Sequence, residues 1–560
     1  MMERFRPLSR RGFLLAAGAA AATAGAAFGQ GQGQGHGMRR IPPNRASDAF
    51  NPDVDLDLIC KRDEARILTG APTRVWRYSG NLIKGPPNAL TAAPDAYLGP
   101  LLRFSKGQKV RIRLRNELPE ETITHWHGLH VPMLMDGHPA AAIDPGETYV
   151  YEFEIRNRAG MYFYHPHTHE KTATQVYRGL AGAIIVEDDE ERALGLPSGE
   201  FEVPLVIQDR SFDDDNQLAY GDDMHTSMFG FYGDRALVNG QRNFALDVAS
   251  RAYRLRILNG SNARIYKLCW DDRTPLTVIG VDGGLLEKPE KRPYVMLAPA
   301  ERVDLLVDFS GRAQGAKLTM LSGEFYGLVP PMAMGSDLAM GEEFPLFTAR
   351  VTKASNDSWK LPERLSTIRR IRREDVANFD NPIPIAITMA HMAMFLNGRP
   401  YGHDDLQPKE RIPVDTTQLI EIFHEHGMGM GMGMGMGMGD MGGGMMRGRM
   451  GGMGMGRMGM GRMGMGGGMG MMGMMSMAHP IHLHGQQFEI VERSFEGDED
   501  AYASIRDGFI DSGLKDTVLV APGERLRIVK PFGDFKGRFM YHCHNLEHED
   551  AGMMREFSVE

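Results

Sequence analysis

One short stretch near the C-terminus carries the residues best suited to bind a metal ion. Cys543 lies between His542 and His544, His548 follows five residues after the cysteine, and Met553 follows ten residues after it. Two imidazoles, one thiolate and a weak thioether are the ligands of a blue-copper electron-transfer site. Such a site needs one more histidine beside Cys543, His548 and Met553, so His542 and His544 are left for other metal ions, joined to the first through Cys543. The alternative is a histidine-rich strand end that binds no metal.

Three further histidine clusters lie far upstream of this stretch. In an extended strand, residues two apart project to the same side, so each His-x-His pair can face one pocket. With the C-terminal pair there are four such pairs, and their eight imidazoles are enough ligands for three metal ions. His479 is left as the second imidazole for the site of Cys543. The four pairs are His125 and His127, His165 and His167, His482 and His484, and His542 and His544.

The N-terminal residues predict export. Arg10 and Arg11 precede an alanine-rich apolar run, which is typical of a twin-arginine signal over residues 1–30. The run is too short for a stable membrane span, although an N-terminal anchor helix is the alternative. The formal net charge of −9 predicts no nucleic-acid partner. If Cys543 binds a metal ion, Cys60 and Cys269 either pack as small hydrophobic side chains or form a disulfide bond.

From about residue 50 the chain is typical of an all-β protein. Residues 109–115 alternate polar and apolar side chains, which is the period of a half-buried strand. Similar patterns recur downstream, at residues 149–155, 254–258, 302–309 and 525–530. We therefore predict three consecutive β-sandwich domains. Their predicted bounds are 50–190, 200–353 and 384–560, with a solvated linker at 354–383 that includes a helical turn.

The third domain contains a long insert, residues 427–477, that consists almost only of Gly and Met. It holds more than half of the 41 methionines of the chain and ends two residues before His479. Thioethers are soft ligands that select Cu(I), and this composition cannot build a core. We therefore predict a loop that gathers Cu(I) next to the blue-copper site. The alternatives are a low-complexity repeat without a role and a flexible lid that covers apolar surface.

Together these motifs resemble the multicopper oxidase family of three-domain cupredoxins, and most closely its bacterial copper-efflux oxidases and laccases. The resemblance covers nearly the whole mature chain and includes residues 254–264 and 281–284. It implies three Greek-key cupredoxin domains and four copper ions, one of type 1, one of type 2 and two of type 3. The implied ligands are His479, Cys543, His548 and Met553 for type 1, His125 and His482 for type 2, His127, His165 and His544 for one type 3 ion, and His167, His484 and His542 for the other.

The family pattern also implies roles outside the copper ligands. Asp136 and Glu549 match acidic residues that supply protons; otherwise they are a turn aspartate and a surface glutamate. Met475 and Met477 match the position of a site for substrate copper, although Met475 stands where the family has an acid. The methionine-rich insert follows the turn at residues 397–398, whereas the best-known relatives have it before that turn. His130, His138 and His169 have no place in the pattern.

The resemblance implies an enzyme that oxidises Cu(I) one electron at a time, as a copper-tolerance function, and reduces O2 by four electrons to water. A laccase that oxidises phenols or aromatic amines is the alternative, and a copper-storage or scaffold cupredoxin is the non-enzymatic one. The expected partners are O2 and either Cu(I) or a small aromatic reductant. We expect a monomeric periplasmic protein.

Overall fold

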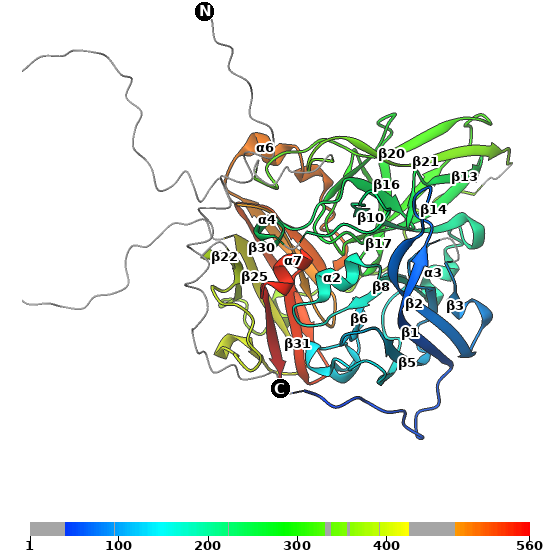
Figure 1. The fold of residues 1–560 in the computed structure, drawn as a ribbon. Helices are drawn as coiled ribbons and strands as arrows, with labels where there is room; N and C mark the ends of the chain where they lie inside the picture. The colour runs from blue at the N-terminus through cyan, green and yellow to red at the C-terminus, as the bar shows by residue number, and fades with distance from the viewer. Residues whose placement is uncertain are drawn as a thin grey trace, which may run out of the picture. The chain divides into compact units, whose positions relative to one another are not determined.

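The computed structural model describes residues 40–560, apart from 94–95, 222, 331–337, 356–358, 391–392 and 425–475. Strands dominate this part of the chain, and its helices are short (Figure 1). The predicted export signal at 1–30, Met475 and nearly all of the insert at 427–477 lie outside the described residues. Among the described residues, we find no helix with the length and apolar character that a membrane crossing requires.

Two sheets are built from the first third of the described residues. One has the order β2 (Thr73–Lys84), β1 (Val54–Ala65), β5 (Lys109–Glu117) and β7 (Thr148–Glu154). The other has the order β3 (Leu90–Thr91), β4 (Leu101–Ser105), β9 (Gly182–Glu187), β8 (Gly160–Pro166) and β6 (Thr124–His127). In β5 the apolar side chains of Val110, Ile112 and Leu114 are buried in the core, so the alternation predicted at 109–115 is confirmed.

The middle of the chain forms the next two sheets. The larger has the order β12 (Gln241–Arg242), β11 (Arg235–Val238), β10 (Glu202–Arg210), β14 (Ala252–Asn259), β19 (Arg302–Asp308), β16 (Leu276–Val281) and β17 (Gly284–Arg292). The smaller has the order β13 (Ala245–Ala249), β21 (Phe344–Lys353), β20 (Lys317–Ser322), β15 (Tyr266–Trp270) and β18 (Val295–Leu297). The half-buried pattern predicted at 254–258 and 302–309 was wrong for β14 and β19, because the side chains of Arg254, Arg256 and Arg302 are also fully buried. Carboxylates compensate these charges; Arg256, for example, contacts Glu202 at 2.7 Å.

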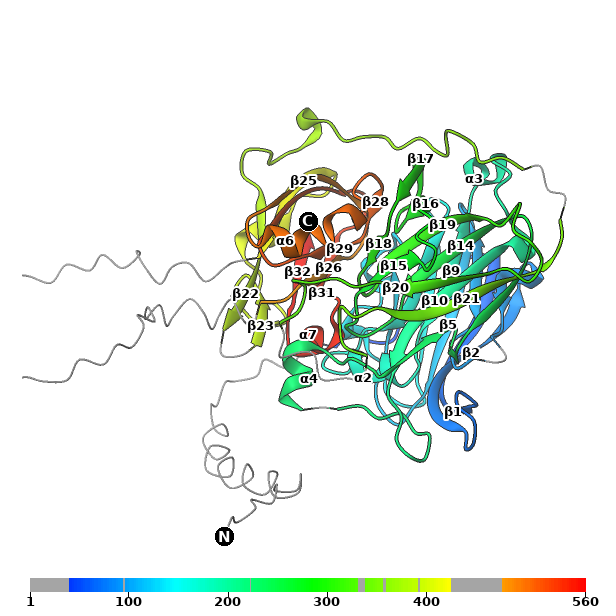
Figure 2. The same cartoon turned by 90° about the horizontal axis from the view of Figure 1, so that it is seen from above.

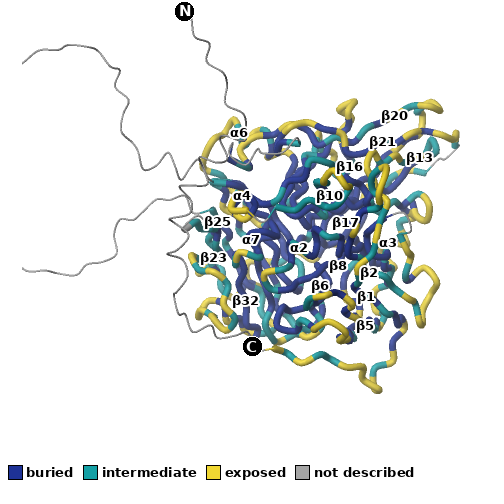
Figure 3. Tube along the Cα trace, in the orientation of Figure 1, coloured by how far each residue is buried: buried dark blue, intermediate teal, exposed yellow. Residues whose placement is uncertain are grey.

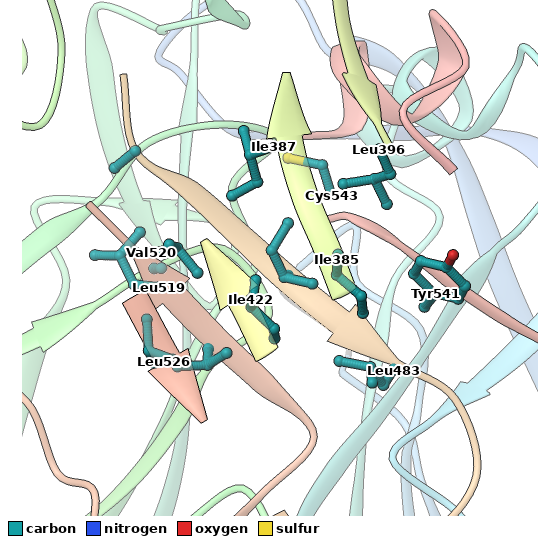
Figure 4. Close-up of a cluster of buried hydrophobic side chains, with 14 of the residues drawn as sticks. Ile385, Ile387, Leu396, Ile422, Leu483, Leu519, Val520, Leu526, Tyr541 and Cys543 are labelled. Atoms are coloured by element: carbon teal, nitrogen blue, oxygen red, sulfur yellow. The ribbon is translucent and has the colours of Figure 1, made fainter. Parts of the chain in front are cut away.

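The C-terminal part forms the last two sheets. One has the order β23 (Ala393–Leu396), β22 (Ile383–Ala390), β25 (Thr416–His424), β30 (Glu524–Phe532), β27 (Phe488–Phe495) and β28 (Leu514–Lys515). The other has the order β24 (Arg411–Ile412), β32 (Met554–Val559), β31 (Gly537–Cys543), β26 (His479–Leu483) and β29 (Thr517–Val520). Figure 4 shows Cys543 within the same buried cluster as Ile385, Ile387 and Ile422.

The three pairs of sheets share one topology. Each sheet contains one parallel pair of strands among antiparallel neighbours. These pairs are β1 with β5, β4 with β9, β10 with β14, β13 with β21, β22 with β25, and β24 with β32. This repetition agrees with the predicted all-β class of three consecutive sandwiches, whereas the exact domain bounds stay predictions. The predicted linker is not fully solvated, since Leu365 and Ile368 are buried, and a helical turn is present at Arg373–Asp375.

Five short α-helices lie beside the sheets in the described part of the chain. They are α2 (Thr172–Tyr177), α3 (Asp189–Ala193), α4 (Met224–Phe229), α6 (Glu499–Ala503) and α7 (Leu546–Asp550). α2 and α4 both contact α7, which directly follows β31 (Figures 1 and 2). Buried positions include β8, α2 and α7, while exposed positions lie mainly on outer loops (Figure 3). The helices and β31 thus place the C-terminal histidines inside the protein.

Candidate metal centres

Four strands bring the four His-x-His pairs together. β6 and β8 pair antiparallel with His125 opposite His165, and β26 and β31 pair antiparallel with His482 opposite His542. The second members of three pairs follow their strands directly, because β8, β26 and β31 end at residues 166, 483 and 543. All eight imidazoles are at most 3% exposed. The structure therefore gathers into one buried region the side chains that the sequence pattern paired only locally.

Within this region the imidazole nitrogens approach one another closely. His542 Nε2 lies 3.2 Å from His484 Nε2 and 3.3 Å from His167 Nε2. His127 Nδ1 lies 3.4 Å from His165 Nε2. The ring of His544 is centred 5.0 and 5.2 Å from the rings of these last two residues. Ligand atoms of His167, His484 and His542 all lie within 4.8 Å of one another, a spacing that a metal ion can bridge.

In most of these imidazoles, one ring nitrogen is hydrogen-bonded to another protein group and the other faces the centre of the histidine cluster. His125 Nδ1 donates to the carbonyl of Asp136 at 2.6 Å, and His482 Nδ1 donates to the carbonyl of Asp516 at 2.8 Å. Their Nε2 atoms are buried and have no hydrogen-bond partner among the described residues. Such an unpaired buried atom is costly, and a metal ion would satisfy it. Burial also lowers the pKa of His482, which favours the neutral form that binds metals.

A second cluster surrounds Cys543, at the end of β31. Its Sγ lies 3.5 Å from His479 Nδ1 and 3.8 Å from His548 Nδ1. Asn545 caps α7 by accepting from the amide of His548 and so sets the position of that imidazole. Met553 is fully buried in the same core cluster, and its carbonyl accepts from the amide of Cys543 at 3.0 Å. Burial raises the pKa of the Cys543 thiol, so a cation is needed to hold the thiolate there.

The two predicted acids both lie against histidines of the first cluster. Asp136 Oδ2 accepts from His484 Nδ1 at 2.8 Å, and Glu549 Oε2 lies 3.0 Å from His542 Nδ1. Both carboxylates are at most 3% exposed, so the alternative of a surface glutamate was wrong. Burial raises the pKa of Asp136, which suits a group that holds and releases a proton. Their roles as proton donors stay predictions.

The structure also reveals partners that the sequence patterns did not indicate. Asp516 Oδ1 and Thr517 Oγ1 both lie 3.1 Å from His127 Nε2. His424 lies with its ring 5.5 Å from that of His479 and donates from Nε2 to the carbonyl of Met477 at 2.8 Å. These residues belong to no short motif, and the only local signal is that His424 ends a strand just before the methionine-rich insert. Non-local pairing of strands brings them to the two clusters.

The remaining predicted residues fall into three groups. Met477 is buried beside the second cluster, whereas the placement of Met475 is not described. His130 and His138 contact Asp534 and Glu556, and His130 lines a small cavity together with His484. All three cysteines are free, so Cys60 and Cys269 form no disulfide bond.

Comparison with known proteins identifies relatives of this chain. Residues 77–191 and 469–560 match two family models that are both described as multicopper oxidase. The structure of the McoA multicopper oxidase from the hyperthermophile Aquifex aeolicus is 31% identical, covers 93% of this chain and 99% of its own, and has a TM-score of 0.70. A laccase of Bacillus subtilis (strain 168) is 28% identical in an alignment of 541 positions that covers 87% of this chain and 90% of that protein. The multicopper oxidase mco of Staphylococcus aureus is 28% identical over 462 residues, which are 82% of each chain.

Three sandwiches with buried histidine clusters and a buried group of Cys543, His479 and His548 thus define a copper-dependent oxidoreductase. The chain belongs to the multicopper oxidase family, as the likeness to the Aquifex enzyme over nearly its whole length establishes. Its buried clusters are consistent with copper sites, and the family reaction uses O2 and a reducing substrate.

Proposed function

We propose that this multicopper oxidase oxidises Cu(I) at the cluster of Cys543 and reduces O2 to water among the four histidine pairs. The copper ligands in this proposal are His479, Cys543, His548 and Met553 for type 1, His125 and His482 for type 2, His127, His165 and His544 for one type 3 ion, and His167, His484 and His542 for the other.

The observation that carries this proposal is the enclosure of the imidazoles around Cys543. His479 and His548 are at most 1% exposed. The Nε2 edge of His548 would face an electron donor. This Nε2 instead donates a hydrogen bond to the carbonyl of Met228 in α4 at 2.9 Å. Electron transfer weakens steeply with distance, so a bulky phenol held outside α4 is a poor donor. A small ion that thioethers can carry inward meets no such barrier.

The side chains around this cluster suit that ion. Met228, Met340 and Met477 are buried in the same apolar cluster as Cys543. Thioethers prefer Cu(I) to harder cations. The insert at 427–477 adds more than half of the methionines of the chain and ends beside His479. The chain therefore concentrates thioethers in the core cluster of Cys543 and, along the sequence, just before His479.

The residues of the chain have separate tasks in this reaction. When bound, copper would supply a one-electron acceptor at Cys543 and an O2-binding centre among the histidine pairs. Cys543 and its neighbours His542 and His544 form the covalent route between the two clusters. Asp136 and Glu549 hold the protons that water formation consumes. Export by the twin-arginine route into the periplasm, as a monomer, would place this activity where it protects against copper.

Laccase activity is the second candidate, favoured by the likeness to the Bacillus subtilis laccase. To separate the two, O2 uptake of the copper-loaded enzyme is measured with Cu(I) and with a bulky phenol. Deleting residues 428–474 should raise the KM for Cu(I) and leave or improve phenol turnover. Met477→Leu should act in the same direction, while Met320→Leu, in the core of the middle sandwich, is the matched control. Unchanged Cu(I) kinetics in the deletion variant, with faster turnover of phenol than of Cu(I), would establish the laccase instead.

A further inference from the structure

Arg302, at the start of β19, is a fully buried guanidinium that contacts all three pairs of sheets. Its Nε donates to the carbonyl of Met161 in β8 at 3.0 Å. Nη1 donates to the carbonyl of Ala300 at 2.9 Å and Nη2 to the carbonyl of Asp282 at 3.1 Å. The two remaining N–H groups form a fork on Asp516, at 2.7 Å to Oδ1 and 2.5 Å to Oδ2. All five N–H donors of this arginine are therefore used, which a lysine cannot reproduce.

Asp516, held by Arg302, in turn contacts two of the histidines. Its Oδ1 lies 3.1 Å from His127 Nε2, and its backbone carbonyl accepts from His482 Nδ1 at 2.8 Å. Thr517 Oγ1 lies 3.1 Å from His127 Nε2 and 3.2 Å from His482 Nδ1. With these nitrogens bound to the protein, His127 Nδ1 faces His165, and His482 Nε2 faces the centre without a partner among the described residues. The orientation of both rings thus depends on where Asp516 is held.

Gly128 gives independent evidence that this ion pair and the histidines are fitted to each other. It follows His127 directly and has a φ of +83°. A Cβ atom at this position would come within 2.5 Å of Asp516 Oδ2 and 2.9 Å of Arg302 Nη2. Only glycine lets the backbone after His127 lie against the ion pair. A shift of Arg302 or Asp516 must therefore also move the backbone that carries His127.

We propose that Arg302 is a positioning residue for the oxygen-reducing centre, acting through Asp516 on His127 and His482. The inference rests on the proposed role of those two histidines as copper ligands. The middle sandwich, which contributes no ligand, would then hold together the ligands that its two neighbours provide. Without the fork, the Asp516 carboxylate is free to turn away from His127, and the backbone carbonyl that holds His482 loses the anchor of its side chain.

The test uses the full-length copper-loaded protein with Arg302→Gln and Arg302→Lys. The matched control is Arg256→Gln, which removes an equally buried arginine of the middle sandwich whose ion pairs lie with Glu191, Glu202 and Asp304. Copper per chain and the electron paramagnetic resonance signals of type 1 and type 2 copper are measured over a series of free copper concentrations. We expect both Arg302 variants to bind type 2 copper about 10- to 100-fold more weakly. Their type 1 signal and its anaerobic reduction by Cu(I) should be unchanged.

The control should keep the wild-type copper content although its folded state is less stable. Equal loss of type 2 copper in Arg256→Gln, or wild-type affinity in both Arg302 variants, would overturn the proposal. If Arg302→Gln does not fold, Asp516→Asn serves in its place, because it keeps the size of the side chain but removes the charge that holds the fork. A wild-type protein without a type 2 signal would contradict the assignment of the copper ligands. A failure of that assignment can therefore be told apart from a failure of the proposed role of Arg302.

Discussion

The most quantitative prediction concerns Lys530, a buried lysine of β30. Its side chain is 1% exposed and donates to the carbonyl of Gln486, and no ion pair among the described residues includes it. It lines a small cavity together with His484, the predicted ligand, and Phe532. Burial lowers its pKa from 10.5 to about 7. Replacement by methionine, which keeps the length of the side chain and removes its charge, should therefore change how stability depends on pH.

The sign follows from proton linkage. Between pH 7 and 10.5 the unfolded chain binds a proton at Lys530 that the folded protein does not, so the free energy of unfolding rises with pH in this window and is constant below it. The cost of the charge to the folded state is about 5 kcal/mol at pH 6 and about 2 kcal/mol at pH 9. Leaving the carbonyl of Gln486 without its donor costs about 1–3 kcal/mol at either pH. We expect Lys530→Met to be about 2–4 kcal/mol more stable than wild type at pH 6 and close to wild type at pH 9.

Urea unfolding of both proteins at the two pH values measures these differences. All other titrating groups are shared, so their contributions cancel when the variant is compared with wild type. Lys106→Met, at an exposed position, is the control and should show no dependence on pH. The decisive quantity is the change of about 3 kcal/mol between pH 6 and pH 9, which does not depend on the lost hydrogen bond. A difference between variant and wild type that is the same at both pH values would refute the reasoning.

Three further predictions address the copper clusters. Cys543→Ser should abolish the absorption band at about 600 nm while copper stays bound among the histidine pairs. Visible spectra and copper analysis check this, and an intact band would contradict the ligand assignment. Asp136→Asn keeps the shape of the side chain but removes its proton, so reoxidation of the reduced enzyme by O2 should slow by about 100-fold in stopped-flow traces, with type 1 reduction unchanged. An equal slowing of both steps would instead indicate general damage. Met553→Leu should raise the type 1 reduction potential, because a thioether donor is lost, and a redox titration with an unaltered potential would exclude Met553 as a ligand.

The histidine pairs and the stretch around Cys543 were the part of the candidate site that the sequence could predict. His-x-His spacing and strand periodicity are local, so the four pairs and the stretch around Cys543 could be recognised residue by residue. The same locality explains the failures. Alternation along β14 and β19 predicted half-buried strands, but Arg254, Arg256 and Arg302 are buried as well, because carboxylates from other elements reach them. A pattern along one strand carries no information about such distant charges.

The sequence by itself determined which atoms are available: eight paired imidazoles, a cysteine between two of them, and a run of thioethers beside His479. Only the tertiary structure decided which nitrogens face each other. His167 and His542 are 375 residues apart in the chain and meet at 3.3 Å. It also decided that Met228 closes the edge of His548 and that Arg302 supports His127 through Asp516. These contacts depend on how the three sandwiches pack against one another, and that packing is set by the whole buried surface rather than by any motif.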